Sequence, residues 1–232
     1  MKEIEPIAFF RSPFTSKFGV PRQSGLVEEL RGRIVFEPEY RREEAVRGLE
    51  EFDYLWLIWG FSENEGRGVA KTPSLTVRPP RLGGNERIGV FASRSPFRPN
   101  GLGLSSVRIV QVGHGEIEVA GADLMDGTPI YDIKPYVAYA DSHPQARGGF
   151  TDRRAWAKLR VEVPEEVAAT LSVGELKTLK KILELDPRPH FHADATRVYG
   201  MPFAGRDVKF RVSDGILSVV QALPVKAESS SR

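Results

Sequence analysis

The chain of 232 residues has no cysteine and only four histidines. The absence of cysteine excludes disulfides, thiolate nucleophiles and zinc sites with cysteine ligands. His190 and His192 are the only close histidine pair, and on a strand both would face the same side, as a metal site requires. Because no third ligand is evident near them, a polar loop is the favoured interpretation, and no metal is expected.

The chain also lacks long hydrophobic runs. The longest, YLWLIWGF at 54–61, has the length of a strand and falls far below the roughly 18 residues that cross a bilayer. The N-terminal MKEIEPIAFF carries two glutamates and a proline where a signal peptide needs an apolar core. With 41% hydrophobic and 28% charged residues, the composition is that of a globular protein. We therefore expect a cytoplasmic protein with no membrane partner.

Helical periodicity is scarce in the first 140 residues or so, and one short helix is predicted there, at 41–49. Eight strands with almost no helix between them disfavour parallel crossovers, so we predict an antiparallel sheet that closes into a β-barrel. These runs are short, apolar or alternating, and separated by Gly, Pro, Asn and Asp, as strands are, and they lie at 4–12, 32–38, 54–61, 74–80, 87–93, 104–113, 116–124 and 129–140.

The pattern changes in the last third of the chain. Leucines and valines recur at three- to five-residue spacings over 165–186, which predicts one or two amphipathic helices with Gly174 as the candidate break. Two apolar runs then flank Ser213-Asp214-Gly215, a hairpin turn. The predicted fold is mainly β, with an antiparallel barrel at 1–160, a small α+β domain at 161–226 and a disordered tail at 227–232.

Two familiar catalytic patterns are incomplete. GLGLSS at 101–106 lacks the third glycine of a dinucleotide fingerprint and continues as a strand, so no helix N-terminus is present to hold a pyrophosphate. Ser93 and Ser95 are not bracketed by the glycines of a nucleophile elbow. Asp141 and His143, two residues apart, do not establish a triad. We therefore reject a Rossmann fold and disfavour a serine hydrolase.

The formal net charge of +2 conceals a basic block. Over 67–108 only Glu86 opposes eight basic residues: Arg67, Lys71, Arg78, Arg81, Arg87, Arg94, Arg98 and Arg108. Guanidinium groups on strands and loops suit phosphate oxygens. The alternative is a solvated basic face with no partner. Nucleic-acid contacts are expected from Arg67, Lys71, Arg78, Arg81 and Arg98.

The tetrapeptide RSPF occurs twice, at 11–14 and at 94–97. Chance, a decayed internal repeat and two loops that serve one site could each explain it. A true repeat should extend over about 20 residues, and this one ends after the phenylalanine. We therefore favour two loops that leave the same end of the barrel. Arg22, Gln23, Arg94, Arg98 and Asn100 would then converge on a polar, anionic group.

The stretch DGTPIYDIKPYV at 126–137 combines a turn and a polar strand. Asp126-Gly-Thr-Pro129 has the composition of a tight turn, with glycine supplying a positive φ. Asp132, Lys134 and Tyr136 follow with a period of two, so one strand face carries an acid, a base and a phenol. That face is either exposed to solvent or lines a pocket, and Asp141 extends the set.

These segments resemble a known family. In order, VPRQSG at 20–25, VRPPRLGGNERIGVFASRSPFRPNGLGLS at 77–105, DGTPIYDIKPYVAYAD at 126–141, DPRPHF at 186–191 and RVYGMPF at 197–203 are similar to the bacterial TrmO (YaeB-like) proteins. The resemblance spans nearly the whole chain. It implies a tRNA methyltransferase that uses S-adenosylmethionine and methylates N6 of threonylcarbamoyladenosine, next to the anticodon of threonine tRNA. It also implies a homodimer whose barrel binds the cofactor near the dimer interface.

The resemblance further implies which residues contact the cofactor. They are Pro21, Arg22, Gln23, Arg94, Leu104, Asp126, Gly127, Thr128 and Pro129. One position departs from the pattern: after the strand at 54–61, relatives often carry a histidine with a polar partner, and this chain has Ser62-Glu63. We expect this pair near the cofactor as well.

The exocyclic nitrogen of adenine is a weak nucleophile, so holding it in line with the methyl group matters most. A proton acceptor would help, and Asn100, Asp132, Tyr136 and Asp141 are the candidate catalytic residues. The Asn-Pro-Pro-Tyr motif of many adenine methyltransferases is absent. Two alternatives stay open: a non-catalytic RNA-binding module, and a methyltransferase that acts on a small molecule or protein.

Overall fold

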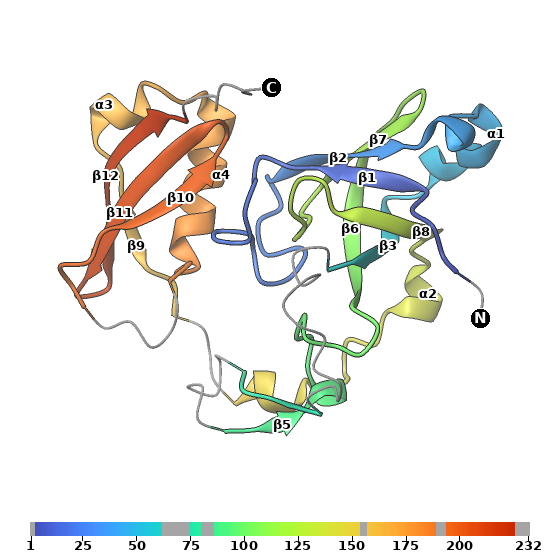
Figure 1. Ribbon diagram of the computed structural model, residues 1–232, viewed down its shortest axis with the longest axis horizontal. Helices are drawn as coiled ribbons and strands as arrows, with labels where there is room; N and C mark the ends of the chain where they lie inside the picture. The colour runs from blue at the N-terminus through green and yellow to red at the C-terminus, as the bar shows by residue number, and fades with distance from the viewer. Residues whose placement is uncertain (1–2, 62–74, 80–85, 154–156, 189–193, 226–232) are drawn as a thin grey trace.

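The structure is a computed structural model that describes residues 3–61, 75–79, 86–153, 157–188 and 194–225. Two bodies are visible, a β-barrel and a smaller unit of sheet and helices that contains the C-terminal part of the chain (Figure 1). The mainly β fold with a barrel and a small α+β unit is the one predicted from the sequence. None of the helices described is long and apolar enough to cross a membrane.

Six strands close the barrel in the order β1, β2, β7, β6, β3, β8, and every neighbouring pair is antiparallel. Their bounds are β1 Ala8–Arg11, β2 Arg31–Phe36, β3 Tyr54–Gly60, β6 Leu102–Val112, β7 Glu116–Ala120 and β8 Pro129–Pro135. Alternate residues of these strands point inward, so Ile34, Leu57 and Ile117 are fully buried in one apolar cluster. Closure leaves no barrel edge exposed.

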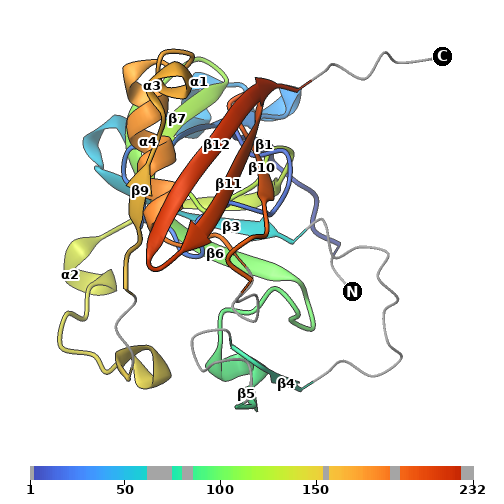
Figure 2. The same cartoon turned by 90° about the vertical axis from the view of Figure 1, so that its left-hand side faces the viewer.

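The barrel uses fewer strands than the sequence predicts. The runs at 74–80 and 87–93 form a separate two-stranded ribbon, β4 (Thr76–Val77) with β5 (Ile88–Gly89), which lies apart from the barrel in Figures 1 and 2. A short 3-10 helix, η5 (Val90–Ala92), follows. The ribbon has no place in the ring because each of the six barrel strands already pairs with a neighbour on both sides.

Two further predicted elements are longer than the observed ones. The helix expected at 41–49 is one turn, α1 (Glu43–Val46), between 3-10 turns η1 (Pro38–Tyr40) and η2 (Leu49–Glu51), because Gly48 takes a left-handed φ of 86°. The strand expected at 129–140 ends at Pro135. A helical turn, α2 (Ala138–Asp141), then forms, with the Asp141 carboxylate accepting the Val137 amide at its start.

The C-terminal unit is a four-stranded sheet in the order β10, β11, β12, β9. Its strands are β9 Arg160–Glu162, β10 Tyr199–Phe203, β11 Arg206–Ser213 and β12 Ile216–Pro224. The predicted hairpin is confirmed: Ser213 pairs with Ile216 across Asp214 and Gly215, which both have positive φ (50° and 76°), as a type I′ turn requires. A short 3-10 turn, η6 (Gly149–Asp152), lies between the two units in sequence.

Two helices pack on this sheet, α3 (Glu165–Ala168) and α4 (Val173–Glu184). The break between them lies before Ser172, not at Gly174, because Ser172 and Glu175 form a capping box that begins α4. Gly174 is therefore a first-turn residue of α4, and the break was predicted too far toward the C-terminus.

The segment at 12–30 connects β1 to β2 and packs into the C-terminal unit. Phe14, Val27 and Leu30 are buried in the cluster that also contains Met201 and Phe210 of the C-terminal sheet. An ion pair of 3.0 Å between Glu29 and Lys177 of α4 adds to this contact. A domain boundary at residues 160 and 161 stays a prediction, and part of the first domain contributes to the core of the second.

Candidate active site

One end of the barrel collects the loops that the sequence singles out. The strand register places the end of β1, the end of β3 and the start of β8 at the same rim, since Phe9 faces Pro129 and Trp59 faces Ile130. The start of β6 joins them because Gly60 pairs with Leu102. Both RSPF copies therefore adjoin this rim, as predicted, the first starting at the last residue of β1 and the second lying shortly before β6. We call this end the loop rim.

The first RSPF copy is held by the turn at 126–128. The Ser12 amide donates to Asp126 Oδ1 (3.1 Å), and the Asp126 amide donates to the Phe14 carbonyl (2.9 Å). Arg11 lies 3.6 Å from Asp126 Oδ2 in an exposed ion pair. The Gly127 amide donates to the Phe10 carbonyl (2.8 Å), so backbone and side-chain bonds both fix this copy on the rim.

The turn predicted at Asp126-Gly-Thr-Pro129 forms one residue earlier, at 125–128, with the expected positive φ at its glycine. The Thr128 amide donates to the Met125 carbonyl, and Gly127 at the third position has φ 76°, the pattern of a type II turn. A methyl group added at Gly127 would meet nothing within 4 Å, so space lies open beside this backbone. Thr128 is buried and donates its hydroxyl to Met125, which leaves the turn backbone and the Asp126 carboxylate as the groups available to a ligand.

The second RSPF copy reaches the segment that follows the first copy. The Arg94 guanidinium donates to Gln23 Oε1 at 2.6 Å, which brings together two residues implied as cofactor contacts. Pro21 beside them is buried. Arg22 points the other way, toward the carbonyls of Asp186 (3.4 Å) and Arg188 (3.3 Å) in the C-terminal unit. Its guanidinium therefore serves the contact between the two units.

A buried polar chain below these loops was missed by the sequence interpretation. Trp59 Nε1 donates to Ser105 Oγ (3.0 Å), and Ser105 donates to Asp123 Oδ1 (2.6 Å). Burial raises the pKa of Asp123, against hydrogen bonds from Ser105 and the Ser24 amide and the positive charge of Arg94. A carboxylate inside the apolar run AGADLM was the available signal, because charged residues are rarely buried without a reason.

Leu104, implied as a cofactor contact, is exposed next to the buried Ser105. The alternation of β6 thus presents an apolar side chain outside and a hydroxyl inside at the loop rim. Of the remaining implied contacts, Ser62 and Glu63 lie outside the described residues.

The candidate proton acceptors are spread over the barrel. Asn100 is exposed in the turn that leads into β6. Asp132 pairs with Lys134 (2.8 Å) on the outer wall, so this strand face meets solvent. Tyr136 packs on the ring of Trp56, with centroids 5.7 Å apart. Because β8 starts at the loop rim and runs away from it, Tyr136, which directly follows β8, lies farther from the RSPF loops than Asp132.

The fourth candidate, Asp141, is engaged in holding local structure. Its carboxylate accepts hydrogen bonds from the Val137 amide (2.8 Å) and from Trp56 Nε1 (3.0 Å). These bonds hold the pKa of Asp141 below its ordinary value, the Val137 amide contributing most. The two hydrogen bonds therefore make this carboxylate a weaker base.

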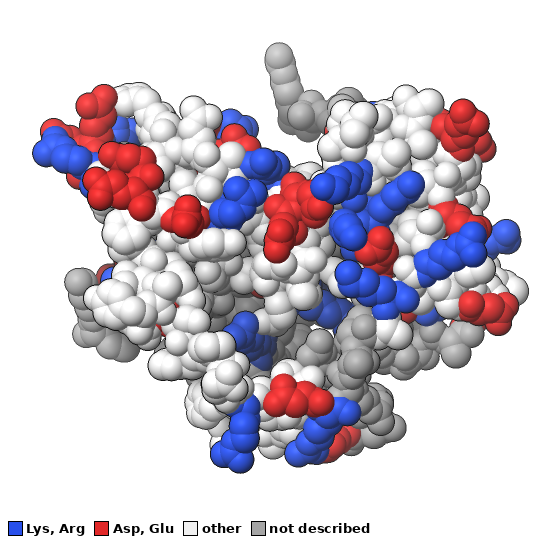
Figure 3. Space-filling view, turned by 180° about the vertical axis from the view of Figure 1, so that it is seen from behind, with Lys and Arg blue, Asp and Glu red and all other residues white. Residues whose placement is uncertain are grey.

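The basic block is only partly described. Arg78 is exposed beside the β4–β5 ribbon, whereas Arg98 donates to the Ser93 carbonyl (2.7 Å) and so stabilises its own loop. Arg67, Lys71 and Arg81 lie outside the described residues, as do His190 and His192. In Figure 3 lysines and arginines are scattered over the visible face with acidic groups between them, and no single basic stripe dominates it.

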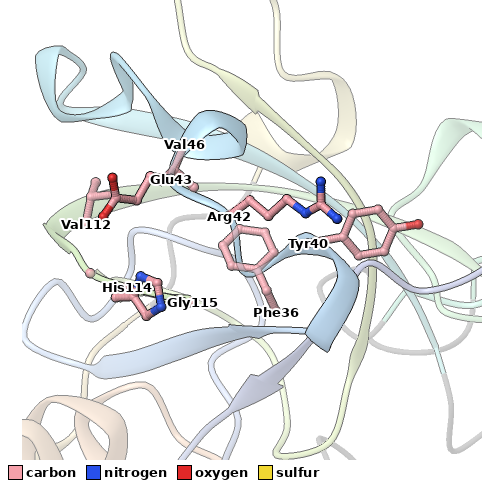
Figure 4. A pocket seen from close by; sticks show the side chains of 9 residues that line it. Phe36, Tyr40, Arg42, Glu43, Val46, Val112, His114 and Gly115 are labelled. Atoms are coloured by element: carbon pink, nitrogen blue, oxygen red, sulfur yellow. The ribbon is translucent and has the colours of Figure 1, made fainter.

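Two surface hollows accompany the barrel. One, of about 650 Å³, runs along the outside of β1, β2 and β7 past the ion pairs Arg31–Glu118 and Arg33–Glu116 to Asp126. The other, of about 230 Å³, lies at the end of the barrel opposite the loop rim, and Figure 4 shows that the Arg42 side chain on its wall extends toward Tyr40 and away from His114. No group of three or more His, Asp or Glu able to hold a metal occurs among the described residues.

Comparison with known proteins identifies relatives that match both units of the chain. The family model of the tRNA-methyltransferase O N-terminal domain matches residues 9–142, and that of the TrmO C-terminal domain matches residues 156–225. The tRNA (adenine(37)-N6)-methyltransferase of Escherichia coli (strain K12) is 37% identical over 96% of this chain and 98% of its own length. A putative S-adenosylmethionine-dependent methyltransferase RcsF of Pseudomonas aeruginosa is 38% identical over 88% of this chain and 90% of its own.

The fold agrees as well. The crystal structure of TrmO from Pseudomonas aeruginosa superposes with a TM-score of 0.77 and 32% identity, covering 96% of this chain and 98% of that one. The matches extend over both the barrel and the C-terminal unit, and they include the loops gathered at the loop rim. The chain belongs to the tRNA-methyltransferase O family.

Proposed function

We propose that this protein transfers a methyl group from S-adenosylmethionine to N6 of adenine 37 in tRNA, and that this adenine carries the threonylcarbamoyl group in threonine tRNA. Membership of the family makes it an S-adenosylmethionine-dependent tRNA (adenine-N6)-methyltransferase. The observation that carries the proposal is the hydrogen bond between Gln23 and Arg94, which joins the segment after the first RSPF copy to the second copy at the loop rim.

The residues at the loop rim fit this cofactor chemically. Arg94 offers a guanidinium for a carboxylate, and Asp126 offers an acceptor for ribose hydroxyls. The open space beside Gly127 lets a ligand approach the turn backbone. S-adenosylmethionine supplies, when bound, an activated methyl group on a sulfonium sulfur. Leu104 adds exposed apolar surface beside these polar groups.

The task of the protein is then mainly to position the adenine. The N6 lone pair is delocalised into the ring, so the rate depends on alignment of this nitrogen with the methyl group. Among the candidate proton acceptors, Asn100 and Asp132 lie nearer to the loop rim than Tyr136 and Asp141. The low pKa of Asp141 further disfavours it as a base.

Binding of the tRNA would use the basic loops. Arg78 is exposed, and it lies between Arg67, Lys71 and Arg81 in the sequence, so the phosphates of the anticodon stem-loop are the expected partners. An R78E variant should lose tRNA affinity and show a shallower dependence on salt.

We further propose that the protein is cytoplasmic and forms a homodimer. Sedimentation equilibrium would test the dimer, which should have twice the mass of the 25.9 kDa chain.

The decisive experiment measures methyl transfer from radiolabelled S-adenosylmethionine to two purified threonine tRNAs. One tRNA carries the threonylcarbamoyl group at adenine 37, and the other is the same tRNA without it. Label in the first alone is the expected result. Label in both would contradict the threonylcarbamoyl requirement, and label in neither, with cofactor bound, would contradict the substrate.

Binding measurements with tRNA and with S-adenosylmethionine separate the rival functions. A non-catalytic RNA-binding module would bind tRNA without binding S-adenosylmethionine. A methyltransferase for a small molecule or protein would bind the cofactor and show no salt-dependent affinity for tRNA. The R78E variant serves as the control, because it should lose tRNA binding while it retains cofactor binding.

A further inference from the structure

Asp123 lies beneath the loops of the proposed cofactor site. It follows β7, and its carboxylate is packed among the Ser24 amide, Ser105 of β6 and Arg94. Ser24 directly follows Gln23, and Ser105 directly follows Leu104, both implied cofactor contacts. The side chain is enclosed by protein and still partly accessible to solvent. It is therefore placed to meet a ligand bound at the loop rim.

The hydrogen bonds below Asp123 all point toward it. The indole of Trp59 can only donate, so Ser105 accepts from Trp59 and uses its own hydrogen for Asp123. The resulting O–H···O distance of 2.6 Å is in the range of bonds to an ionised carboxylate. Gly103 makes this chain fit, because a side chain at that position would overlap the Trp59 ring. The barrel interior thus holds a negative charge directed at the loop rim.

This carboxylate forms no ion pair within 4.0 Å among the residues that the structure describes. Arg94 is the nearby cation, and its guanidinium is directed to Gln23. Burial of an unpaired charge is costly, and here it is strong enough to raise the pKa of Asp123. An enclosed carboxylate without an ion pair is suited to bind a ligand that carries a positive charge.

We propose that the Asp123 carboxylate binds a positive charge of the cofactor, its sulfonium or its α-ammonium group. The inference rests on the proposed function, because it takes S-adenosylmethionine as the ligand. Arg94 and Asp123 then form a matched pair of opposite charges, one for the carboxylate and one for a cation of the same ligand. Asp123 is in this account a cofactor-binding residue, and Ser105 and Trp59 position it.

Three ligands distinguish the two cations. S-adenosylmethionine carries both, S-adenosylhomocysteine carries only the ammonium, and methylthioadenosine carries neither. Binding of each to wild type and to D123N would be measured by calorimetry. We expect D123N to lose about tenfold or more in affinity for S-adenosylmethionine, the effect of one charge pair, and to bind methylthioadenosine like wild type. A loss shared by S-adenosylhomocysteine assigns the ammonium, and a loss confined to S-adenosylmethionine assigns the sulfonium.

Two results would overturn the inference: D123N that binds S-adenosylmethionine within about threefold of wild type, or an equal loss for methylthioadenosine. If wild type itself fails to bind S-adenosylmethionine, the proposed function falls and this inference falls with it. The matched control is D207N, which removes a carboxylate from the exposed Asp207–Lys209 pair of the C-terminal sheet. D207N should leave all three affinities unchanged.

Stability and pH separate a binding role from a structural one. A raised pKa means that the ionised Asp123 carboxylate is less favourable in the folded than in the unfolded chain. The neutral side chain of D123N should therefore give a melting temperature no lower than that of wild type at neutral pH. If D123N does not fold, wild type gives the second test. As pH falls through the raised pKa, Asp123 loses its charge, and affinity for S-adenosylmethionine relative to methylthioadenosine should fall. Arg94, the charged group facing Asp123, stays protonated, while Ser105, Trp59 and the Ser24 amide are neutral. A ratio that stays constant as the pH is lowered from neutrality to the onset of acid unfolding would overturn the proposal.

Discussion

The two RSPF copies share four residues and one local turn, yet their phenylalanines lie in different environments. In the first, the Phe14 amide donates to Ser12 Oγ at 3.3 Å, and in the second, the Phe97 amide donates to Ser95 Oγ at 3.2 Å. Phe14 is completely buried, whereas Phe97 is 61% exposed. The sequence of the tetrapeptide thus determines its turn, and the surrounding chain determines what its phenylalanine does.

The difference comes from the C-terminal unit. The ring of Phe14 packs against Phe203 with centroids 5.7 Å apart, inside a core built mainly by the last 70 residues or so. The second copy follows η5 and faces solvent instead, with Phe91 also exposed nearby in sequence. The first copy therefore anchors the loop rim to the C-terminal unit, and the second leaves its phenylalanine exposed to solvent.

The largest expected contrast is between F14A and F97A. Removal of a fully buried phenylalanine should lower the free energy of unfolding by about 3–5 kcal/mol, because it leaves a cavity in the shared core. F97A should change it by about 0.5 kcal/mol at most, as exposed positions usually do. Urea denaturation of both variants measures the contrast. Equal losses would contradict the different roles assigned to the two phenylalanines.

The next contrast concerns the glycines beside each copy. Gly19 has φ 96°, and a methyl group there would overlap the side chain of Met201, which is fully buried, so its displacement would disturb the packing of the core. Gly101 has φ 59° with nothing within 4 Å of an added methyl group. G19A should cost about 2–4 kcal/mol of unfolding free energy, and G101A about 1–2 kcal/mol from left-handed strain alone. Thermal melting of both variants decides whether the first copy is the more tightly packed.

The sequence was sufficient for the loops and insufficient for their packing. The turn around Asp126-Gly127 and the hairpin at Asp214-Gly215 follow from residue chemistry close in the chain, whereas the meeting of both RSPF copies at one end was predicted from their repetition and is produced by the barrel register. The burial of Phe14 depends on Met201 and Phe203, nearly 190 residues away, and no local sequence pattern predicts it. Asp123 was missed for a related reason: its importance lies in Ser105 and Trp59, which only the barrel register brings beneath it.

The arginines of the two copies also differ, with a smaller expected effect. Arg11 makes an exposed ion pair with Asp126, so R11A should change the free energy of unfolding by at most about 1 kcal/mol. Arg94 holds Gln23 at 2.6 Å, and R94A should weaken S-adenosylmethionine binding by about tenfold, because it loses a charged hydrogen-bond donor of the proposed site. Calorimetry gives the affinity. A double variant with Q23A should lose less than the sum of the single losses, since the two residues act together.

The smallest contrast tests the shared turn itself. S12A and S95A each remove the hydroxyl oxygen that accepts the amide of the phenylalanine two residues later. In the first copy that amide lies next to a buried ring, so S12A should cost about 1 kcal/mol of unfolding free energy. In the second copy water can replace the hydroxyl, and S95A should cost about 0.5 kcal/mol at most. The Ser12 amide still donates to Asp126 in S12A, so the loss reports the hydroxyl alone. A larger loss in S95A than in S12A, measured by urea denaturation, would show that the second copy is the one on which the fold depends.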